Sequence, residues 1–295
     1  MPKRILSIDG GGVRGILPAS ALVALEAQLG KPVREVFDFI AGTSTGALIA
    51  AACAAGVPAT RILGIYTQRS KEIFNHSPAI ALSLRLARGW AYDPRNLKRV
   101  LASEFGAAAN WTLNDSPVKL LLTAKRMNKR PLYFVPDIQK NACTMGKLFL
   151  IDCAVASAAA TTYFDAYDVP GVGLAYDGGL GVAGNPCHQA CVEAFRYDTY
   201  DPKDTRIVSL GTGFYPESNT KPSGLIAEVG WVLDSLLNAP EDEQTFLVNN
   251  YYPGIMRRFN WKLPEPIDMA SVASIPKLTE IGKGITGGVD WSKVL

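Results

Sequence analysis

The first 55 residues contain the same arrangement twice: a short apolar run, a turn of small residues, and a helical pattern. Arg4–Ile8 is followed by an aspartate and three consecutive glycines, and Val36–Ile40 leads into Gly-Thr-Ser-Thr-Gly at 42–46. The segments after these turns, Ile16–Leu29 and Thr45–Ala55, have the apolar spacing and end signals of helices. Buried strands that alternate with helices in this way are typical of parallel sheets. We therefore predict an α/β fold with an open, mostly parallel sheet.

Further strands and helices are predicted along the rest of the chain. The predicted strands are Val118–Thr123, Leu132–Val135, Gly173–Asp177 and Arg206–Leu210. One predicted helix begins after Pro58, and another covers Leu148–Ala160. Four predicted strands end in turns of small residues, and in an open α/β sheet ligands bind at the carboxyl ends of the strands. The tail contains predicted helices at 225–237 and 275–285 but no catalytic motif. We expect residues 216–295 to pack on the same domain as a core at 1–215.

Positive charge is concentrated in one segment. Residues 61–130 contain 13 Lys and Arg against four Asp and Glu, although the whole chain has a net charge of only +3. So small a net charge does not indicate a nucleic-acid partner. Within the segment, residues 78–90 predict an amphipathic basic helix that carries Leu82, Leu86, Trp90, Arg85 and Arg88. Such a helix suits an anionic membrane surface or an ordinary core-facing position, and both interpretations stay open.

The cysteines and the first residues predict a cytoplasmic protein without a metal. Five cysteines are an odd number spread over a long chain, which favours a reducing compartment over a disulfide framework. Cys187, His188 and Cys191 have no second ligand pair at zinc-site spacing, so we interpret them as a packed helix face. The apolar run after Arg4 is too short for a secretory signal.

The glycine-rich turn has two possible uses. Gly10, Gly12 and Gly15 match G-x-G-x-x-G between a strand and a helix, which is the fingerprint of NAD(P)-binding oxidoreductases. That fingerprint requires an acidic residue at the end of the second strand, and Glu35 precedes the strand instead. Consecutive glycines also leave backbone N–H groups free to face an anion, with Arg14 in the same turn.

The pentapeptide around Ser44 has the sequence of a nucleophile elbow. Gly42 and Gly46 flank the serine between a predicted strand and a predicted helix. Glycines are needed there because the serine occupies a strained turn, and the following helix directs its positive end toward the same point. The alternative is a buried hydroxyl that caps the helix.

A nucleophilic serine needs a base, and the chain contains only two histidines. Ser44, Asp177 and His188 follow the order of the α/β-hydrolase triad. His188 comes only 11 residues after Asp177, however, which leaves little chain to bring it between the acid and the serine. His76 has no evident partner. We expect both histidines to have surface or capping roles.

Three motifs, taken in order, resemble the signatures of the patatin-like phospholipases. They are Asp9–Gly15, Gly42–Gly46 and Asp177–Gly179. The resemblance runs from residue 4 to about 213 and implies a three-layer α/β/α fold around a mostly parallel sheet. It places motif glycines in the turns at Gly10, Gly15, Gly42, Gly46, Gly178 and Gly179.

The same resemblance implies a serine–aspartate dyad without histidine. Ser44 would be the nucleophile and Asp177 the base. The amides of Gly11 and Gly12 would form the oxyanion hole, while Arg14 would hold the turn or meet a lipid phosphate.

The expected function is hydrolysis of fatty acyl esters of phospholipids or related lipids through an acyl-serine, without a metal or an organic cofactor. Contact with a membrane through residues 78–90 is the expected way to reach the substrate. Two alternatives stay open at this point: an NAD(P)-binding oxidoreductase that uses the glycine loop, and a catalytically silent lipid-binding module.

Overall fold

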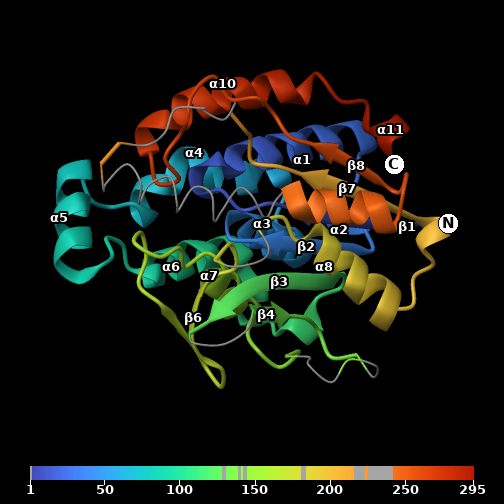
Figure 1. The fold of residues 1–295 in the computed structure, drawn as a ribbon, viewed down its shortest axis with the longest axis horizontal. Helices are drawn as coiled ribbons and strands as arrows, with labels where there is room; N and C mark the ends of the chain where they lie inside the picture. The colour runs from blue at the N-terminus through green and yellow to red at the C-terminus, as the bar shows by residue number, and fades with distance from the viewer. Residues whose placement is uncertain are drawn as a thin grey trace.

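A single mixed sheet forms the centre of the molecule (Figure 1). The computed structural model describes residues 2–127, 131–138, 141, 145–180, 184–215, 223–224 and 242–295. In these residues the sheet has eight strands: seven follow the order β5-β6-β3-β2-β1-β7-β8, and the eighth, β4, pairs with β3 beside that path. The strands are β1 (Lys3–Ile8), β2 (Phe39–Thr43), β3 (Lys119–Arg126), β4 (Pro131–Phe134), β5 (Tyr167–Val169), β6 (Gly173–Asp177), β7 (Thr205–Leu210) and β8 (Met256–Phe259).

The strands at the middle of the sheet are parallel, and the edge beyond β3 is not. β3, β2, β1, β7 and β8 all run in the same direction. β4 and β6 are antiparallel to β3, and β5 is antiparallel to β6. The prediction of a mostly parallel sheet is confirmed. However, β6 (Gly173–Asp177) runs in the opposite direction to β3 and to the other parallel strands.

Helices cover both faces of the sheet. Leu6 and Ile8 of β1 pack into one core with side chains of α1, α3, α4, α6, α7 and α10. Ile5, which points to the other face, packs with α8 and with helical residues 242–251. The helices are α1 (Ile16–Leu29), α2 (Val33–Val36), α3 (Thr45–Ala55), α4 (Ala59–Ile73), α5 (Pro78–Arg88), α6 (Pro94–Phe105), α7 (Leu150–Ser157), α8 (Cys187–Cys191), α10 (Ile275–Thr286) and α11 (Trp291–Val294). The three-layer α/β/α arrangement is therefore present.

One predicted strand lies in a different place. Val36–Ile40 was expected to be extended, but Val33–Val36 forms a helical turn after Pro32, and β2 begins only at Phe39. The apolar run misled the prediction because Phe37 is buried in a bent connection and not in the sheet. The shift carries the first residues of the Gly-Thr-Ser-Thr-Gly turn into the strand itself.

The described tail is continuous with this architecture. β8 extends the sheet beside β7, and α10 lies along α1 (Figure 1). The predicted helix at 275–285 is confirmed by α10, whereas the predicted helix at 225–237 lies outside the described residues. The division at residue 215 stays a prediction. No helix in the described part of the chain has the length and apolar character needed to cross a bilayer.

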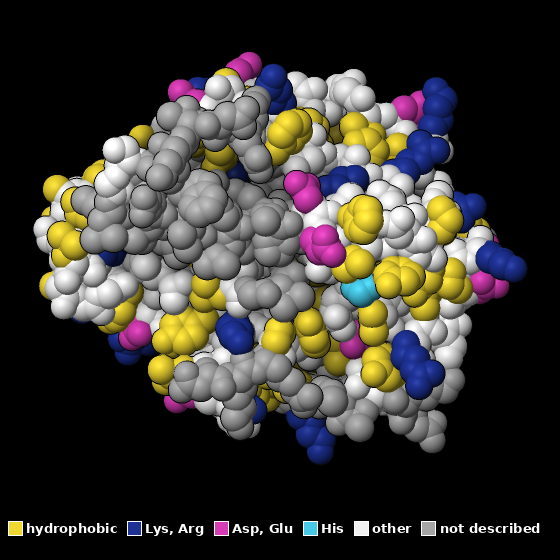
Figure 2. All heavy atoms as spheres, viewed as in Figure 1, with side chains coloured by type: hydrophobic (Ala, Val, Ile, Leu, Met, Phe, Trp, Pro, Cys, Tyr) yellow, Lys and Arg dark blue, Asp and Glu magenta, His cyan; other side chains and the backbone are white. Residues whose placement is uncertain are grey.

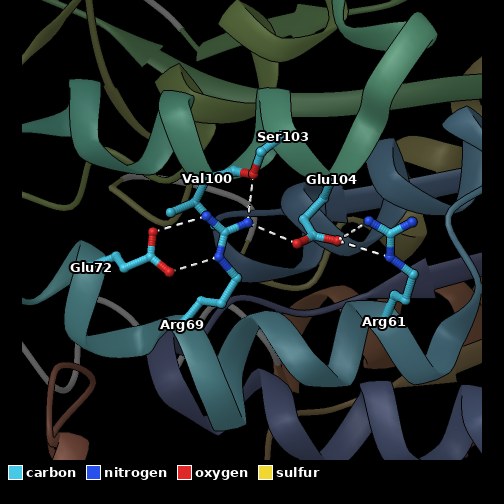
Figure 3. A network of polar contacts seen from close by, with 6 residues as sticks. All are labelled: Arg61, Arg69, Glu72, Val100, Ser103 and Glu104. Carbon is cyan, nitrogen blue, oxygen red and sulfur yellow. Dashed lines mark hydrogen bonds and ion pairs between the residues drawn. The ribbon is translucent and has the colours of Figure 1, made fainter.

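A charged network joins α4 to α6 (Figure 3). Glu104 of α6 accepts hydrogen bonds from Arg69 and Arg61 of α4, each at 2.7 Å, and its side chain is only 12% exposed. Arg69 also donates to Ser103 Oγ and forms a paired contact with the exposed Glu72. Hydrogen bonds to charged groups are stronger than neutral ones, so this carboxylate fixes the distance between the two helices.

We predict that Glu104→Gln destabilises the protein by about 1–2 kcal/mol, because the amide removes the charge that two arginines share. Urea denaturation measures the change in the free energy of unfolding. Glu72→Gln is the matched control and should cause a smaller loss, because the Glu72 carboxylate is screened by solvent. Equal stability of Glu104→Gln and the native chain would contradict a structural role for the network.

Candidate active site

Ser44 occupies a sharp turn between β2 and α3. Its φ of 55° and ψ of −123° lie in a region that costs an L-residue on the order of 1–3 kcal/mol. The neighbouring glycines are required by close contact. A Cβ on Gly42 would lie 2.2 Å from the Gly46 carbonyl oxygen, and a Cβ on Gly46 would lie 2.1 Å from the Ile8 carbonyl oxygen. The turn can form because Gly42 and Gly46 have no Cβ, which lets the backbones of β1, β2 and α3 come into direct contact.

The end of α7 holds Ser44 and Asp177 in a common frame. The Ser44 N–H donates to Ser157 Oγ at 2.9 Å, and the Gly178 N–H donates to the Ser157 carbonyl at 3.2 Å. The Asp177 N–H donates to the Ala159 carbonyl at 3.0 Å. Ser157 is fully buried. None of the three motifs contains Ser157, and the only signal in its local sequence is the run of small residues at 156–160.

Strand register explains why residues 133 positions apart in sequence become neighbours. Thr43 pairs with Thr123 across β2 and β3, and Ser44 follows directly. β6 runs antiparallel to β3 and stops where Asp177 pairs with Ala124, one residue beyond Thr123. The reversed strand therefore ends at the level of the carboxyl edge of its neighbours, so Asp177 reaches the same edge as Ser44.

The carboxyl group of Asp177 is held in a dry place. The residue is 4% exposed, and its Oδ1 accepts the Gly179 N–H at 2.8 Å. Its Oδ2 is buried and accepts no well-aligned hydrogen bond from the described residues. Burial raises the pKa of Asp177 to about 6, and the Ser44 hydroxyl and the Gly179 amide each offset part of that rise. Asp177 is thus a stronger base than an ordinary aspartate, and the Ser44 hydroxyl lies within its reach.

The glycine loop presents two unused backbone donors. The amides of Gly10 and Val13 donate to carbonyl groups of the chain. Between them, the amides of Gly11 and Gly12 donate to no acceptor in the described ranges. Gly11 has a φ of 151° and Gly12 a φ of 59°, conformations that side-chain-bearing residues rarely adopt. Gly12 lines the same pocket as Ser44, so this part of the loop adjoins the serine.

Arg14 lies on this loop. Its side chain is buried, and both its Nε and its backbone N–H donate to the Gly11 carbonyl, at 3.3 and 3.2 Å. These two bonds hold the turn at Gly11, and contact of Arg14 with a lipid phosphate stays a prediction.

An ion pair from the tail lies beneath the loop. Arg258 of β8 donates to the fully buried Asp9 at 2.6 Å and to Ser209 Oγ at 2.8 Å. Asp9 directly precedes the three glycines, so this pair ties the base of the loop to β7 and β8. Arg258 has no motif around it, and nothing in its local sequence signals the contact.

An apolar pocket opens beside Ser44. It encloses about 620 Å³, counting the part that is open to solvent. Its walls come from α3, α4, α6, the segment after α7 and one tail residue. The larger lining side chains are Leu48, Ile65, Tyr66, Ile73, Phe74, Leu97, Tyr163, Phe164 and Met269. Such a lining suits an apolar ligand.

The alternative sites are not assembled. His188 lies beside Tyr251 and His76 stacks on Tyr92, and in the described structure neither imidazole forms a hydrogen bond with Ser44 or Asp177. Glu35 lies in α2 before β2 begins, so it is not at the strand end where a ribose would be bound. Among the described residues, no three His, Cys, Asp or Glu side chains are grouped as metal ligands. Cys53, Cys153, Cys187 and Cys191 are buried free thiols.

Comparison with known proteins agrees with the motifs. The family model described as patatin-like phospholipase matches residues 6–191. A cGAMP-activated phospholipase of Vibrio cholerae is 32% identical over 249 residues, which cover 78% of this chain and 69% of that protein. A cUMP-AMP-activated phospholipase of Escherichia coli is 31% identical over 79% of this chain and 72% of its own length.

Two more distant similarities are also present. The 85/88 kDa calcium-independent phospholipase A2 of Rattus norvegicus is 28% identical over 72% of this chain and 27% of its own length. Among solved structures, VipD from Legionella pneumophila aligns with 97% of this chain and 67% of its own at 13% identity, with a TM-score of 0.45. The family match covers more than half of the sequence and includes all three motifs. The chain therefore belongs to the patatin-like phospholipase family.

Proposed function

We propose that this protein hydrolyses fatty acyl esters of phospholipids, with Ser44 as the nucleophile and Asp177 as the base. The observation that carries the proposal is a serine that lines an apolar pocket, with a buried carboxylate of raised pKa within hydrogen-bonding reach of its hydroxyl. In the adjacent glycine loop, the amides of Gly11 and Gly12 donate to no acceptor among the described residues, and Gly12 lines the same pocket. Relatives named as phospholipases support a phospholipid substrate. The oxidoreductase alternative lacks its acidic residue, and a silent module would not need a basic carboxylate beside a serine.

The proposed reaction has two stages. In the first, Asp177 accepts the Ser44 proton while Oγ attacks the ester carbon, and the oxyanion accepts hydrogen bonds from Gly11 and Gly12. The intermediate collapses to an acyl-serine, and the departing alcohol takes the proton from Asp177. In the second stage Asp177 deprotonates a water that attacks the acyl-serine, which releases a fatty acid and restores the hydroxyl. These steps consume water alone and require no cofactor.

The electrostatics explain how a carboxylate can replace an imidazole. A carboxyl of pKa about 6 is poised near neutral pH, whereas an ordinary aspartate would be a much weaker base. A single oxyanion donor contributes roughly 2.7–4 kcal/mol to catalysis. The N-terminal end of α3, which starts at Thr45, adds a favourable dipole for negative charge at the serine.

We also propose the cytosol as the compartment of this protein. The buried free thiols of Cys53, Cys153, Cys187 and Cys191 support it, because free thiols are typical of a reducing environment.

We further propose that α5 carries the protein to the membrane. Three large apolar side chains on this helix face solvent: Ile80 is 52% exposed, Leu82 57% and Leu86 81%. Only Ala81 is buried, which contradicts a core-facing helix. Figure 2 shows hydrophobic side chains at the edge of the molecule where α5 lies in Figure 1. The expected stripe is shorter than predicted, because the helix ends at Arg88 and Trp90 lies beyond it.

The position of α5 connects it to the pocket. The Arg85 Cζ lies over the Tyr163 ring, 4.3 Å from its centroid, and the guanidinium donates to Thr162 Oγ1 at 3.0 Å. Tyr163 lines the pocket. An apolar, cationic helix beside the entrance suits an anionic bilayer, because it brings the opening to the lipid that must enter.

Substitution of each member tests the proposed dyad. Ser44→Ala and Asp177→Asn should each lower hydrolysis of a p-nitrophenyl acyl ester by roughly a thousandfold or more. Fluorophosphonate labelling should be lost in Ser44→Ala. In the native protein kcat/KM should fall about tenfold per pH unit below about pH 6, as Asp177 becomes protonated.

The matched control is a chain in which both His76 and His188 are replaced, and it should retain most of the activity. Complete loss in that variant would restore a histidine triad. Lipid binding without turnover in the native protein would favour the silent module.

The burial of Asp177 also has a consequence for the free energy of unfolding. Asp177→Asn should stabilise the fold at neutral pH, because the raised pKa means that native Asp177 must ionise in a buried place. The folded-state pKa is about 6 and the ordinary value is 3.8, so the destabilisation is absent below about pH 4 and reaches up to about 3 kcal/mol above pH 7. Urea denaturation of both chains across this range measures the difference. A constant difference between the two chains at all pH values would exclude the proposed burial of charge.

The proposed role of α5 is tested by binding to vesicles. Leu82→Glu combined with Leu86→Glu should reduce binding to phosphatidylglycerol vesicles, measured by sedimentation, at least tenfold. Hydrolysis of a short-chain soluble ester should change little. Phe246→Glu, which alters an exposed apolar side chain away from α5, is the control and should bind normally. Unchanged binding of the double variant would refute the role of α5.

A further inference from the structure

The turn after β7 contacts the glycine loop through one hydroxyl. Thr212 follows the end of β7, and its side chain is 1% exposed. Its Oγ1 donates to the Gly10 carbonyl oxygen at 2.5 Å. The approach is so close that a Cβ on Gly11 would lie 2.2 Å from this hydroxyl oxygen. Thr212 does not line the pocket that contains Ser44.

Peptide geometry converts this bond into control of a different atom. In a planar trans peptide, the carbonyl of one residue and the N–H of the next point in opposite directions. A donor that holds the Gly10 oxygen therefore fixes the direction of the Gly11 N–H. Arg14 acts on the next peptide in the same way, because its donors hold the Gly11 oxygen and so orient the Gly12 N–H.

Such anchors are needed because glycines rotate freely. Gly11 and Gly12 both have positive φ values and no side chain that could limit their motion. Their amides have no partner among the described residues that would hold them from the other side. The loop can keep its donors aimed only if its carbonyl groups are held.

We propose that Thr212 is a positioning residue for catalysis, which aims the Gly11 amide at the oxyanion that forms at Ser44. This inference rests on the hydrolase function proposed above. Thr212 touches neither substrate nor reacting atoms, and it acts through the Gly10–Gly11 peptide. Because the amide is aimed at the oxyanion and not at the ground-state ester, loss of the hydroxyl lowers kcat and leaves KM almost unchanged.

The test compares four variants with the native chain. Thr212→Val has a similar shape without the donor, and Thr212→Ala removes the donor without any risk of overpacking. Thr212→Ser keeps the donor. Thr205→Val is the matched control: Thr205 begins β7, the strand that Thr212 follows, is equally buried, and donates its hydroxyl to the Asp201 carbonyl at 2.7 Å, far from the loop.

We expect Thr212→Val and Thr212→Ala to lose roughly 10- to 100-fold in kcat on a soluble acyl ester, with KM within about threefold of the native value. Thr212→Ser should recover activity to within about threefold. Thr205→Val should retain native kcat even where its unfolding midpoint falls. Affinity for a trifluoromethyl ketone, whose adduct with serine carries an oxyanion, should decrease in parallel with kcat, whereas affinity for the fatty acid product should not.

The outcomes separate this inference from the function on which it rests. Native kcat in folded Thr212→Val or Thr212→Ala, while Ser44→Ala is inactive, overturns the role of Thr212 alone. The same holds if Thr212→Ser fails to recover activity, or if Thr205→Val loses as much kcat as Thr212→Val. Full activity of Ser44→Ala overturns the proposed function itself. If Thr212→Val does not fold, the decision passes to Thr212→Ala and Thr212→Ser.

Discussion

The strained turn at Ser44 is the constraint on which the rest of the site depends. An L-residue at positive φ persists only where the surroundings determine its backbone more strongly than its own preference does. Here Gly42 and Gly46 allow β1, β2 and α3 to meet without side chains between them, and the buried hydroxyl of Ser157 accepts the Ser44 N–H. The turn presents the Ser44 side chain at the apolar pocket, and every other proposed catalytic group is arranged around it.

Burial provides the second requirement, and it opposes stability. A carboxylate in a dry position is costly to ionise, which raises the pKa of Asp177 and makes it a better base. Few donors satisfy it, and its Oδ2 accepts no well-aligned bond in the described part of the chain. A fully hydrogen-bonded aspartate in this position would stabilise the fold more but would accept a proton from serine less readily. In the proposed mechanism, the loss of stability caused by burying Asp177 is useful because the Ser44 hydroxyl lies within reach of this stronger base.

The tail takes part in the site although it carries no motif. Arg258 pairs with Asp9 below the glycine loop, and the Met269 carbonyl accepts the Val13 N–H at the start of the next turn. Met269 also lines the apolar pocket. The loop that presents the free amides is therefore held from β7, from β8 and from the segment after it, so its geometry depends on contacts over the length of the chain.

By itself, the sequence determined the elements whose signals are local: the apolar strands, the glycine turns, the helix that starts at Thr45, and the order of the three motifs. The resemblance of these motifs to the patatin-like phospholipases also singled out Ser44 and Asp177 as the proposed nucleophile and base. Only the tertiary structure decided that β6 runs antiparallel, that β2 starts at Phe39, and that Ser157, Thr212 and Arg258 form hydrogen bonds with Ser44, Gly10 and Asp9. The reason is that strand direction and long-range hydrogen bonds arise from packing between distant segments. A buried serine, threonine or arginine has the same local sequence signal whether or not it meets such a partner.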